Sequence, residues 1–329
     1  MLFRSHAILL GITTLTSLDT ANALADIIAS RFNENNTELV DINALRTEKT
    51  KIKFVKMQSC GNDYIFFDNM DGKITCPESL AINFVDRHFG VGGDGIALIE
   101  RSDVADAKMR IFNKDGSEGR MAGNSIRCVA KYLFDNGMVK GKNITIETLS
   151  GVKELSLFTF NGKVSSVSVE MGKAVLDGRN IPSTLDGESV VDRAITVGGK
   201  NYNVTLVNVG NPHCVVFCDK VDAVDVPNVG PLFEYSEYFP ERVNTEFVRV
   251  VNDTTLKMRV WERGNGETLA CGTGAAAAVV AAVLNGYCRP DTDVTVKVRG
   301  GDLFVRYTSD GMVTLTGGVK QVFEGYIEF

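Results

Sequence analysis

The chain has 329 residues, of which 44% are hydrophobic and 23% are charged, a composition that excludes an intrinsically disordered protein. A chain of this length typically folds into about two domains. The formal net charge is −6 and the sequence contains no basic run, which argues against a nucleic-acid-binding protein.

The N-terminal segment is open to two interpretations. Arg4 precedes an apolar stretch over residues 7–18 and an A-x-A sequence at 21–23, a pattern loosely typical of a secretory signal. Four serines and threonines dilute the stretch, which is too short and polar to span a membrane. The alternative is an amphipathic helical extension that continues over residues 23–34. We favour the extension, and we expect residues 1–51 to lie outside the fold of a cytoplasmic protein.

The rest of the chain contains an internal repeat at an offset of 149 residues. The sequence from Met109 aligns without gaps with the sequence from Met258. The same offset places Asn62 on Asn211, so two separate motifs agree on one alignment. A repeat this long indicates a duplicated domain rather than a solenoid. The further matched pairs are Arg110 and Arg259, Glu118 and Glu267, Gly123 and Gly272, Asn136 and Asn285, and Gly137 and Gly286.

In chain order, the first copy contains a predicted helix over residues 124–137, "NSIRCVAKYLFDNG", followed by a strand over 165–172. Its polar residues predict that this helix is less buried than its counterpart. In the second copy, residues 213–219 and 255–264 read as strands, and further strands are predicted over 295–308 and 312–318. The sequence "GTGAAAAVVAAVLNG" predicts a wholly apolar helix that is buried on every side and ends at Asn285–Gly286.

The duplication therefore predicts two pseudo-symmetric lobes, with a cleft in which the N-termini of the two helices face each other. We expect the first lobe to comprise residues 52–170 and 318–329, and the second to comprise residues 171–317.

The cysteines give no sign of a metal site. The sequence has no CxxC pair and only three histidines, so neither a zinc site nor an iron site is predicted. We expect reduced and mostly buried thiols. The seven cysteines are Cys60, Cys76, Cys128, Cys214, Cys218, Cys271 and Cys288.

Cys271 is the strongest candidate for a reactive group. It directly precedes the apolar helix, whose free N–H groups and positive partial charge are expected to lower the pKa of a thiol. The Gly-Thr-Gly sequence after it allows backbone N–H groups to approach a carboxylate. Two thiols facing each other across a cleft could remove a proton from one face of a carbon and return one to the other, without metal or cofactor. The repeat, however, aligns Cys271 with Ala122.

Six motifs give the chain a resemblance to the diaminopimelate epimerase family over residues 52–329. They are "FVKMQSCGNDYIFFD", "RHFGVGGDG", "MRIFNKDGSEGRMAGNSIRCVAKYL", "GNPHCVVF", "RVNTEFV" and "WERGNGETLACGTGA". The resemblance implies an α+β fold in which each lobe is a mainly antiparallel sheet rolled around a central helix. It also implies interconversion of LL- and meso-diaminopimelate in lysine and cell-wall biosynthesis, no cofactor, no membrane association, and a homodimer.

The resemblance also implies which residues contact the substrate. Arg263 is expected to clamp the distal carboxylate, and asparagines can hold both ammonium and carboxylate groups. His213 and Glu262 are expected to orient or polarise a thiol. The expected substrate-contacting residues are Asn62, Asn113, Gly123, Asn124, Asn211, Asn244, Glu262, Arg263, Gly272 and Thr273.

The sequence departs from the family pattern at two positions. Ser59 replaces a more usual glycine, a change that we interpret as tolerated. The larger departure is Ala122, which stands where the family pattern Met-Cys-Gly-Asn has its first catalytic cysteine. Cys128 lies about 9 Å further along the helix and is rotated away. Cys60, close to Asn62 in sequence, is the better substitute thiol, and Ser125 is a poor base without a partner.

Three hypotheses remain open from the sequence. The chain is an epimerase impaired by a Cys→Ala substitution, or a one-thiol relative that acts as a lyase or racemase on another amino acid, or a non-catalytic amino-acid-binding protein.

Overall fold

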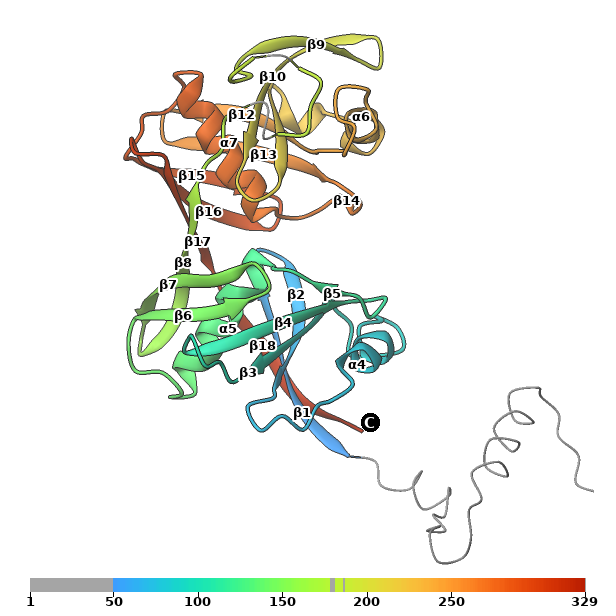
Figure 1. The fold of residues 1–329 in the computed structure, drawn as a ribbon, viewed down its shortest axis with the longest axis vertical. Coiled ribbons are helices and arrows are strands. Elements are labelled where there is room, and N and C mark those ends of the chain that lie inside the picture. Colours follow the sequence, from blue (N-terminus) through green and yellow to red (C-terminus); the bar gives the residue numbers. More distant parts are fainter. Residues whose placement is uncertain (1–49, 178–180, 186, 329) are drawn as a thin grey trace, which may run out of the picture. The chain divides into compact units, whose positions relative to one another are not determined.

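The computed structural model describes residues 50–177, 181–185 and 187–328 (Figure 1). The description below concerns residues 51–329, which form one compact unit. The predicted N-terminal extension lies outside the described residues, apart from its last two. The second of these, Lys51, is already the first residue of a strand.

The first half of the fold is a curved sheet around one central helix. From one edge, its main strands follow the order β18, β1, β2, β3, β4, β6, β7 and β8. Its elements are β1 (Lys51–Ser59), β2 (Asn62–Asp68), α4 (Pro77–Phe84), β3 (Gly95–Glu100), β4 (Ala107–Asn113), β5 (Glu118–Gly119), α5 (Gly123–Asp135), β6 (Asn143–Thr148), β7 (Gly151–Phe160), β8 (Lys163–Lys173) and β18 (Lys320–Glu328).

The second half repeats this arrangement strand for strand, in the order β9, β10, β11, β12, β13, β15, β16 and β17. Its elements are β9 (Arg193–Val197), β10 (Lys200–Asn208), β11 (Pro212–Phe217), η2 (Val221–Ala223), α6 (Val226–Glu234), β12 (Asn244–Asn252), β13 (Thr255–Glu262), β14 (Gly266–Glu267), α7 (Gly272–Leu284), β15 (Asp293–Val298), β16 (Gly301–Tyr307) and β17 (Met312–Gly318).

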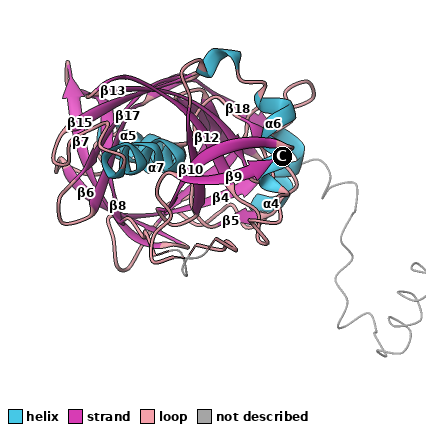
Figure 2. Cartoon of the chain, turned by 90° about the horizontal axis from the view of Figure 1, so that it is seen from above, coloured by secondary structure: helices cyan, strands magenta, loops and turns pink. Residues whose placement is uncertain are grey.

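The two halves agree in pairing as well as in order. β2–β3 and β4–β6 are parallel in one half, β11–β12 and β13–β15 are parallel in the other, and the remaining main pairs are antiparallel. α5 and α7 each have 13 residues, and their first residues are 149 apart. The α+β fold of two pseudo-symmetric lobes is therefore confirmed. Figure 2 shows both helices enclosed by strands.

Each lobe also contains the same ion pair, at positions related by the 149-residue offset. Arg110 on β4 donates from Nε to Oε1 of Glu118 at 2.7 Å. Arg259 on β13 donates from Nε to Oε1 of Glu267 at 2.8 Å. Each pair ties a long strand to the short strand that precedes the central helix, so both helix starts are reached by the same local structure.

Two strands connect the halves. β8 continues from its pairing with β7 into an antiparallel pairing with β17, so that all strands form one sheet. β18 then returns the chain to the first half, where it pairs with β1. Figure 1 shows β8 and β17 running between the two halves.

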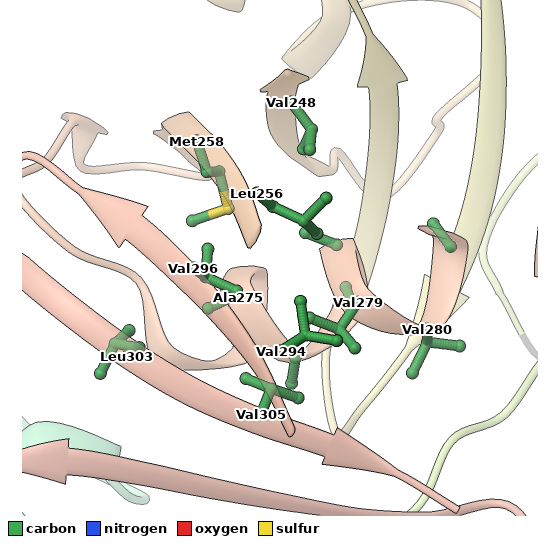
Figure 3. Packing of buried hydrophobic residues seen from close by; sticks show 14 of the residues in the cluster. Val248, Leu256, Met258, Ala275, Val279, Val280, Val294, Val296, Leu303 and Val305 are labelled. Atoms are coloured by element: carbon green, nitrogen blue, oxygen red, sulfur yellow. The ribbon is translucent and has the colours of Figure 1, made fainter. Parts of the chain in front are cut away.

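The helix α7 is buried as its sequence predicts. Its residues from Gly274 to Ala282 are all buried, and apolar strand residues surround it (Figure 3). The helix ends as expected, because Gly286 has a φ of +75° and donates its N–H to the carbonyl of Val283 at 3.0 Å. The labelled residues in Figure 3 are Val248, Leu256, Met258, Ala275, Val279, Val280, Val294, Val296, Leu303 and Val305.

The prediction that α5 is less buried is wrong. Nine of its residues are buried, the same number as in α7. Two cationic side chains are buried with hydrogen bonds that offset their desolvation. Lys131 donates to Asp135 at 2.7 Å and to the carbonyl of Val164 at 2.6 Å. Arg127 is 0% exposed and donates to Ser59. Polar residues in this helix therefore indicate internal bonding rather than a solvated face.

Candidate functional site

A cleft of ≈ 950 Å³ collects the start of α5, the start of α7 and turns from both halves of the sheet. The predicted site residues that line it are Asn62, Asn113, Ala122, Gly123, Asn124, Asn211, Glu262, Cys271, Gly272 and Thr273. Ten positions predicted from sequence motifs are therefore brought together in one cavity.

Ala122 and Cys271 are the N-cap residues of the two helices. Ala122 has φ −134° and ψ 113°, and Cys271 has φ −117° and ψ 115°. Each carbonyl accepts the first helical hydrogen bond at 3.0 Å, from Ile126 and Ala275 respectively. The backbone thus presents the side chains of both residues in the same way, and the sulfur atom is the feature that one end lacks.

The Cys271 thiol is capped and enclosed. Its Sγ accepts the N–H of Gly274 at 3.3 Å and lies 3.4 Å from Oγ1 of Thr273. The predicted lowering of its pKa is wrong. Burial raises the pKa well above its usual value, and the carboxylates of Glu262 and Glu246 raise it further, against the opposing effect of the two hydrogen bonds. Cys271 therefore rests as a neutral thiol, which is the form that donates a proton.

Glu262 lies beside this thiol, and the orienting role expected for Glu262 and His213 stays a prediction. Glu262 accepts a hydrogen bond from Oγ1 of Thr268, and burial raises the pKa of its carboxyl. His213 is fully buried, with Nδ1 2.7 Å from Oε1 of Glu246 and Nε2 2.9 Å from Oδ1 of Asn211. His213 does not line the cleft, and its contact with a cleft residue is the one with Asn211.

Two cleft asparagines present a carbonyl oxygen. The Nδ2 of Asn62 donates to Oδ2 of Asp94 at 2.8 Å. The Nδ2 of Asn113 donates to Oγ of Ser117 at 3.0 Å. In both residues the side-chain oxygen is the atom that can receive a hydrogen bond from a ligand, as an ammonium group requires.

Two other cleft asparagines present an amide NH2 group. The Oδ1 of Asn124 accepts from Nη2 of Arg127, and the Oδ1 of Asn211 lies against Nε2 of His213. The Nδ2 atoms are then the groups available to a ligand carboxylate. The cleft therefore contains acceptors and donors that are fixed by their neighbours.

Asn244 and Arg263 do not line the cleft. Asn244 is buried; it donates to the carbonyl of Pro212 at 2.8 Å and accepts the N–H of Arg263 at 3.0 Å. The Nη1 of Arg263 donates to the carbonyl of Glu241 at 2.9 Å. Asn244 thus holds the turn that follows β13, and the expected carboxylate clamp at Arg263 stays a prediction.

The other thiols considered as substitutes lie outside the cleft. Cys128 is 1% exposed, and burial raises its pKa to about 12. Cys60 is also buried, among core residues of the second half, and burial raises its pKa as well. Within the described residues, Cys271 is the single cysteine among those that line the cleft.

Sequence analysis missed several polar residues of the cleft. Tyr64 lies at the repeat position of His213 and could have been found by applying the 149-residue offset. Burial raises the pKa of Tyr64 to about 12, and Asp94 and Glu262 add to the shift. Further cleft residues that were not predicted are Arg87, Asp94, Lys114, Arg120, Lys153, Glu170, Asn265, Glu267 and Thr268.

In the described part of the chain, no helix has the length and hydropathy needed to cross a bilayer. The same residues contain no group of three His, Cys, Asp or Glu side chains placed to hold a metal ion.

Comparison with known proteins agrees with the resemblance drawn from the motifs. A family model described as diaminopimelate epimerase matches residues 54–176 and 205–322. A diaminopimelate epimerase from Methanococcus maripaludis is 48% identical over 278 residues, covering 84% of this chain and 100% of that protein. One from Acetivibrio thermocellus is 47% identical over 278 residues, covering 84% of this chain and 99% of that protein.

The fold also occurs in more distant proteins. A solved structure described as a probable proline racemase from Agrobacterium radiobacter matches with a TM-score of 0.62 and 17% identity. The match covers 84% of this chain and 93% of that one. At this identity the likeness concerns the two-lobed fold alone.

Proposed function

Because the chain belongs to the diaminopimelate epimerase family, we propose that its cleft binds diaminopimelate and that Cys271 transfers a proton at the α-carbon. Ala122 leaves the opposite face of that carbon without a thiol. The proposed activity is interconversion of the LL and meso isomers, impaired in this chain by that one missing group.

The equivalence of the two N-cap residues carries this proposal. The backbone at Ala122 is arranged as it is at Cys271, with the same hydrogen bond to the fourth residue of the helix start. The residues that follow, Gly123 and Asn124, line the cleft just as Gly272 and Thr273 do. Both helix ends therefore open into the same cavity, as proton transfer at the two faces of one carbon requires.

The helix ends supply the groups that stabilise negative charge. The first N–H groups of a helix have no partner within the helix, and they carry the positive end of its dipole. Two such ends at one cleft can hold the carboxylate beside the reacting carbon and the charge that develops when its proton leaves. The chain's own backbone thus provides this stabilisation.

The fixed amides support binding of an amino acid at both ends of the substrate. The carbonyl oxygens of Asn62 and Asn113 suit an ammonium group, and the NH2 groups of Asn124 and Asn211 suit a carboxylate. A diamino dicarboxylate carries two groups of each kind.

The proton balance explains why one thiol does not suffice. In the thiolate form, Cys271 takes the α-proton, and the electron pair of the C–H bond remains on the substrate as a stabilised carbanion. Returning a proton from the same sulfur regenerates the starting isomer. Inversion requires a second donor on the opposite face, at position 122. The parent chain is therefore expected to exchange the α-hydrogen with solvent without epimerising the substrate.

The test compares the parent chain with Ala122→Cys on LL-diaminopimelate in deuterated buffer. The variant is expected to form the meso isomer at least 10²–10⁴-fold faster than the parent, the range typical of one general acid–base group. Ala122→Cys combined with Cys271→Ala serves as the matched control and should lose epimerisation again. Lack of epimerisation by Ala122→Cys would overturn the proposal.

The same samples separate the two alternative functions. Keto-acid formation from a hydroxylated amino acid would identify a lyase. Tight amino-acid binding without exchange, unchanged by Cys271→Ala, would identify a binding protein.

Compartment and assembly are further parts of the proposal. All seven cysteines are free thiols, which supports a reducing, cytoplasmic compartment. The homodimer is supported by the family resemblance, and sedimentation of the purified chain tests it.

A further inference from the structure

Arg127 is a buried cation that the proposed proton transfer does not use. It lies on α5, one turn after Asn124, and its side chain is 0% exposed. Helical side chains lean toward the N-terminus, so its guanidinium reaches back to the first turn of the helix. There, Nη2 donates to Oδ1 of Asn124 and, at 2.8 Å, to Oγ of Ser59.

The guanidinium has no anionic side chain beside it in the described part of the structure. The ionisable groups that act on its pKa are the thiols of Cys60 and Cys128, and burial lowers that pKa. Its Nη1 is buried without a hydrogen-bond partner among the described residues. A buried charge without a counter-ion is strongly unfavourable, so a nearby negative charge is stabilised by it.

Two further contacts, and a hydrogen bond that supports one of them, hold the guanidinium in place. Nε donates to Oγ of Ser59 at 3.2 Å, and that hydroxyl donates to the carbonyl of Gly318 at 2.7 Å. A Cβ at Gly317 would lie 2.9 Å from the guanidinium carbon, so the group packs flat against β17. The serine that departs from the family pattern is therefore a direct partner of this arginine.

In the second lobe, the charged side chain behind the corresponding helix start is negative rather than positive. At the 149-residue offset, Arg127 aligns with the buried Ala276, and the buried Ala97 aligns with Glu246. Glu246 lies against the first turn of α7, because a Cβ at Gly274 would be 2.7 Å from its Oε1. The duplicated helix ends therefore have a cation behind one and a carboxylate behind the other.

We propose that Arg127 is a positioning residue that makes the α5 end of the cleft the anion-holding half of the site. Its guanidinium fixes the amide of Asn124 with the NH2 group toward the cleft and stabilises negative charge at position 122. This inference deepens the proposed proton-transfer function, because it makes position 122 the place of a thiolate and Cys271 the place of a thiol.

Several other polar and charged side chains face position 122 and Cys271, and none of them is altered in the test variants. Position 122 shares the cleft with Tyr64 on β2, Asp94 before β3, Arg120 before α5, and Glu262 and Glu267 across the cleft. Cys271 is faced by Glu262 on β13, Glu246 on β12 and Thr273 on its own helix. A difference between variants that alter Arg127 alone isolates its contribution.

The first measurement uses Ala122→Cys without any change at Arg127. Alkylation by iodoacetamide is followed from pH 5 to 11, and peptide mass spectrometry assigns each thiol. The thiol introduced by Ala122→Cys should react with a midpoint at lower pH than Cys271. An equal or higher midpoint would overturn the proposal.

The second measurement adds Arg127→Met to Ala122→Cys. The midpoint of the introduced thiol should rise by about 1 pH unit or more, a fall of about tenfold in alkylation rate at pH 7, while Arg127→Lys should retain the low midpoint. Lys131→Met is the matched control, because Lys131 is a buried cation on the same helix that is paired with Asp135. A shift equal to that of Arg127→Met in this control, or no shift in Arg127→Met, contradicts the proposal.

These readouts need no substrate and no turnover. If Ala122→Cys does not epimerise diaminopimelate but its thiol depends on Arg127, the proposed function fails and the role of Arg127 stands. If Arg127→Met does not fold, a midpoint of the introduced thiol that is not below that of Cys271 still overturns the proposal, and Arg127→Lys supplies the comparison at position 127.

Discussion

Ala122 and Cys271 start two equivalent helices with nearly the same backbone angles, φ −134° and −117° and ψ 113° and 115°. The Sγ of Cys271 caps its helix by accepting the N–H of Gly274 at 3.3 Å, whereas the methyl group of Ala122 caps nothing. The helix that starts at Ala122 therefore has no side-chain cap, and under the proposed function it also lacks a proton-transfer group. The two effects can be separated by the choice of substituent.

Ala122→Ser should stabilise the protein without restoring epimerisation. Serine is among the best N-cap residues, so the free energy of unfolding should rise by about 0.5–2 kcal/mol, measured by urea denaturation. Its hydroxyl is a poor base without a partner, so the meso isomer should not form. Ala130→Ser, in the buried middle of α5, is the control and should destabilise by burying a hydroxyl. Robust epimerisation by Ala122→Ser would show that the site needs a hydrogen-bonding atom rather than a thiol.

The rate of α-hydrogen exchange in the parent chain should increase with pH. Under the proposed function the base is the thiolate of Cys271, whose pKa is raised well above its usual value by burial and by two carboxylates. Below that pKa the thiolate fraction, and with it the exchange rate, rises about tenfold per pH unit. NMR of substrate in deuterated buffer between pH 7 and 9 measures the slope. A rate that is flat over this range would mean that substrate binding lowers the pKa of Cys271 below 7 or that another group is the base.

His213 should affect ligand binding through Asn211. The two side chains are 2.9 Å apart, and this contact sets which end of the Asn211 amide faces the cleft. His213→Gln and Asn211→Ala should each weaken binding of diaminopimelate to the parent chain by about tenfold, because each removes one oriented hydrogen bond. The double variant should lose little more than either single one, because both changes remove the same interaction. Calorimetry measures all three.

Asn201→Ala on β10 is the control for these binding measurements. Asn201 bonds to Thr196 on the neighbouring strand and does not line the cleft. Fully additive losses at His213 and Asn211 would contradict a shared role.

The repeat is the reason that much of the fold could be predicted from sequence. The helix α7 contains no polar residue after Thr273, so its sequence predicted that it would be buried on every side. The 149-residue offset then fixed where α5 begins, even though its sequence is mixed. The burial of α5 could not be predicted in the same way, because the partners of Arg127 and Lys131 come from Ser59 and Val164, which are distant in sequence.

The sequence predicted which residues line the cleft better than it predicted the chemical properties of those residues. Motifs identified the residues at the helix starts, but the pKa of Cys271 depends on Glu246, which the sequence did not connect with it. The dipole at a helix start and the desolvation of a buried thiol have opposite effects, and only the depth of burial decides between them. Arg263 follows Glu262 directly, yet Glu262 lines the cleft and Arg263 does not, and the donation from Arg263 to the carbonyl of Glu241 is a contact that adjacency in sequence does not reveal.

The closeness of Glu246 to α7 gives a final prediction at two repeat-equivalent positions, Gly274 and Ser125. A Cβ at Gly274 would lie 2.7 Å from Oε1 of Glu246 and 3.2 Å from Cβ of Cys271. Because Glu246 is fully buried and bonded to His213, it cannot move aside freely. Gly274→Ala should therefore destabilise the protein by about 1–3 kcal/mol, as overpacking does in a filled core.

Ser125→Ala makes the corresponding change in α5. The Oγ of Ser125 is buried and makes no close hydrogen bond among the described residues, although it interacts with the hydroxyl of Tyr64. Its removal should therefore change the free energy of unfolding by no more than about 0.5 kcal/mol. Gly274→Ala should also slow alkylation of Cys271, since displacement of the first turn moves the N–H that caps its sulfur. Equal stability of the two variants would mean that Glu246 can move away from α7, and burial and Glu262 would then account for the raised pKa of Cys271 without it.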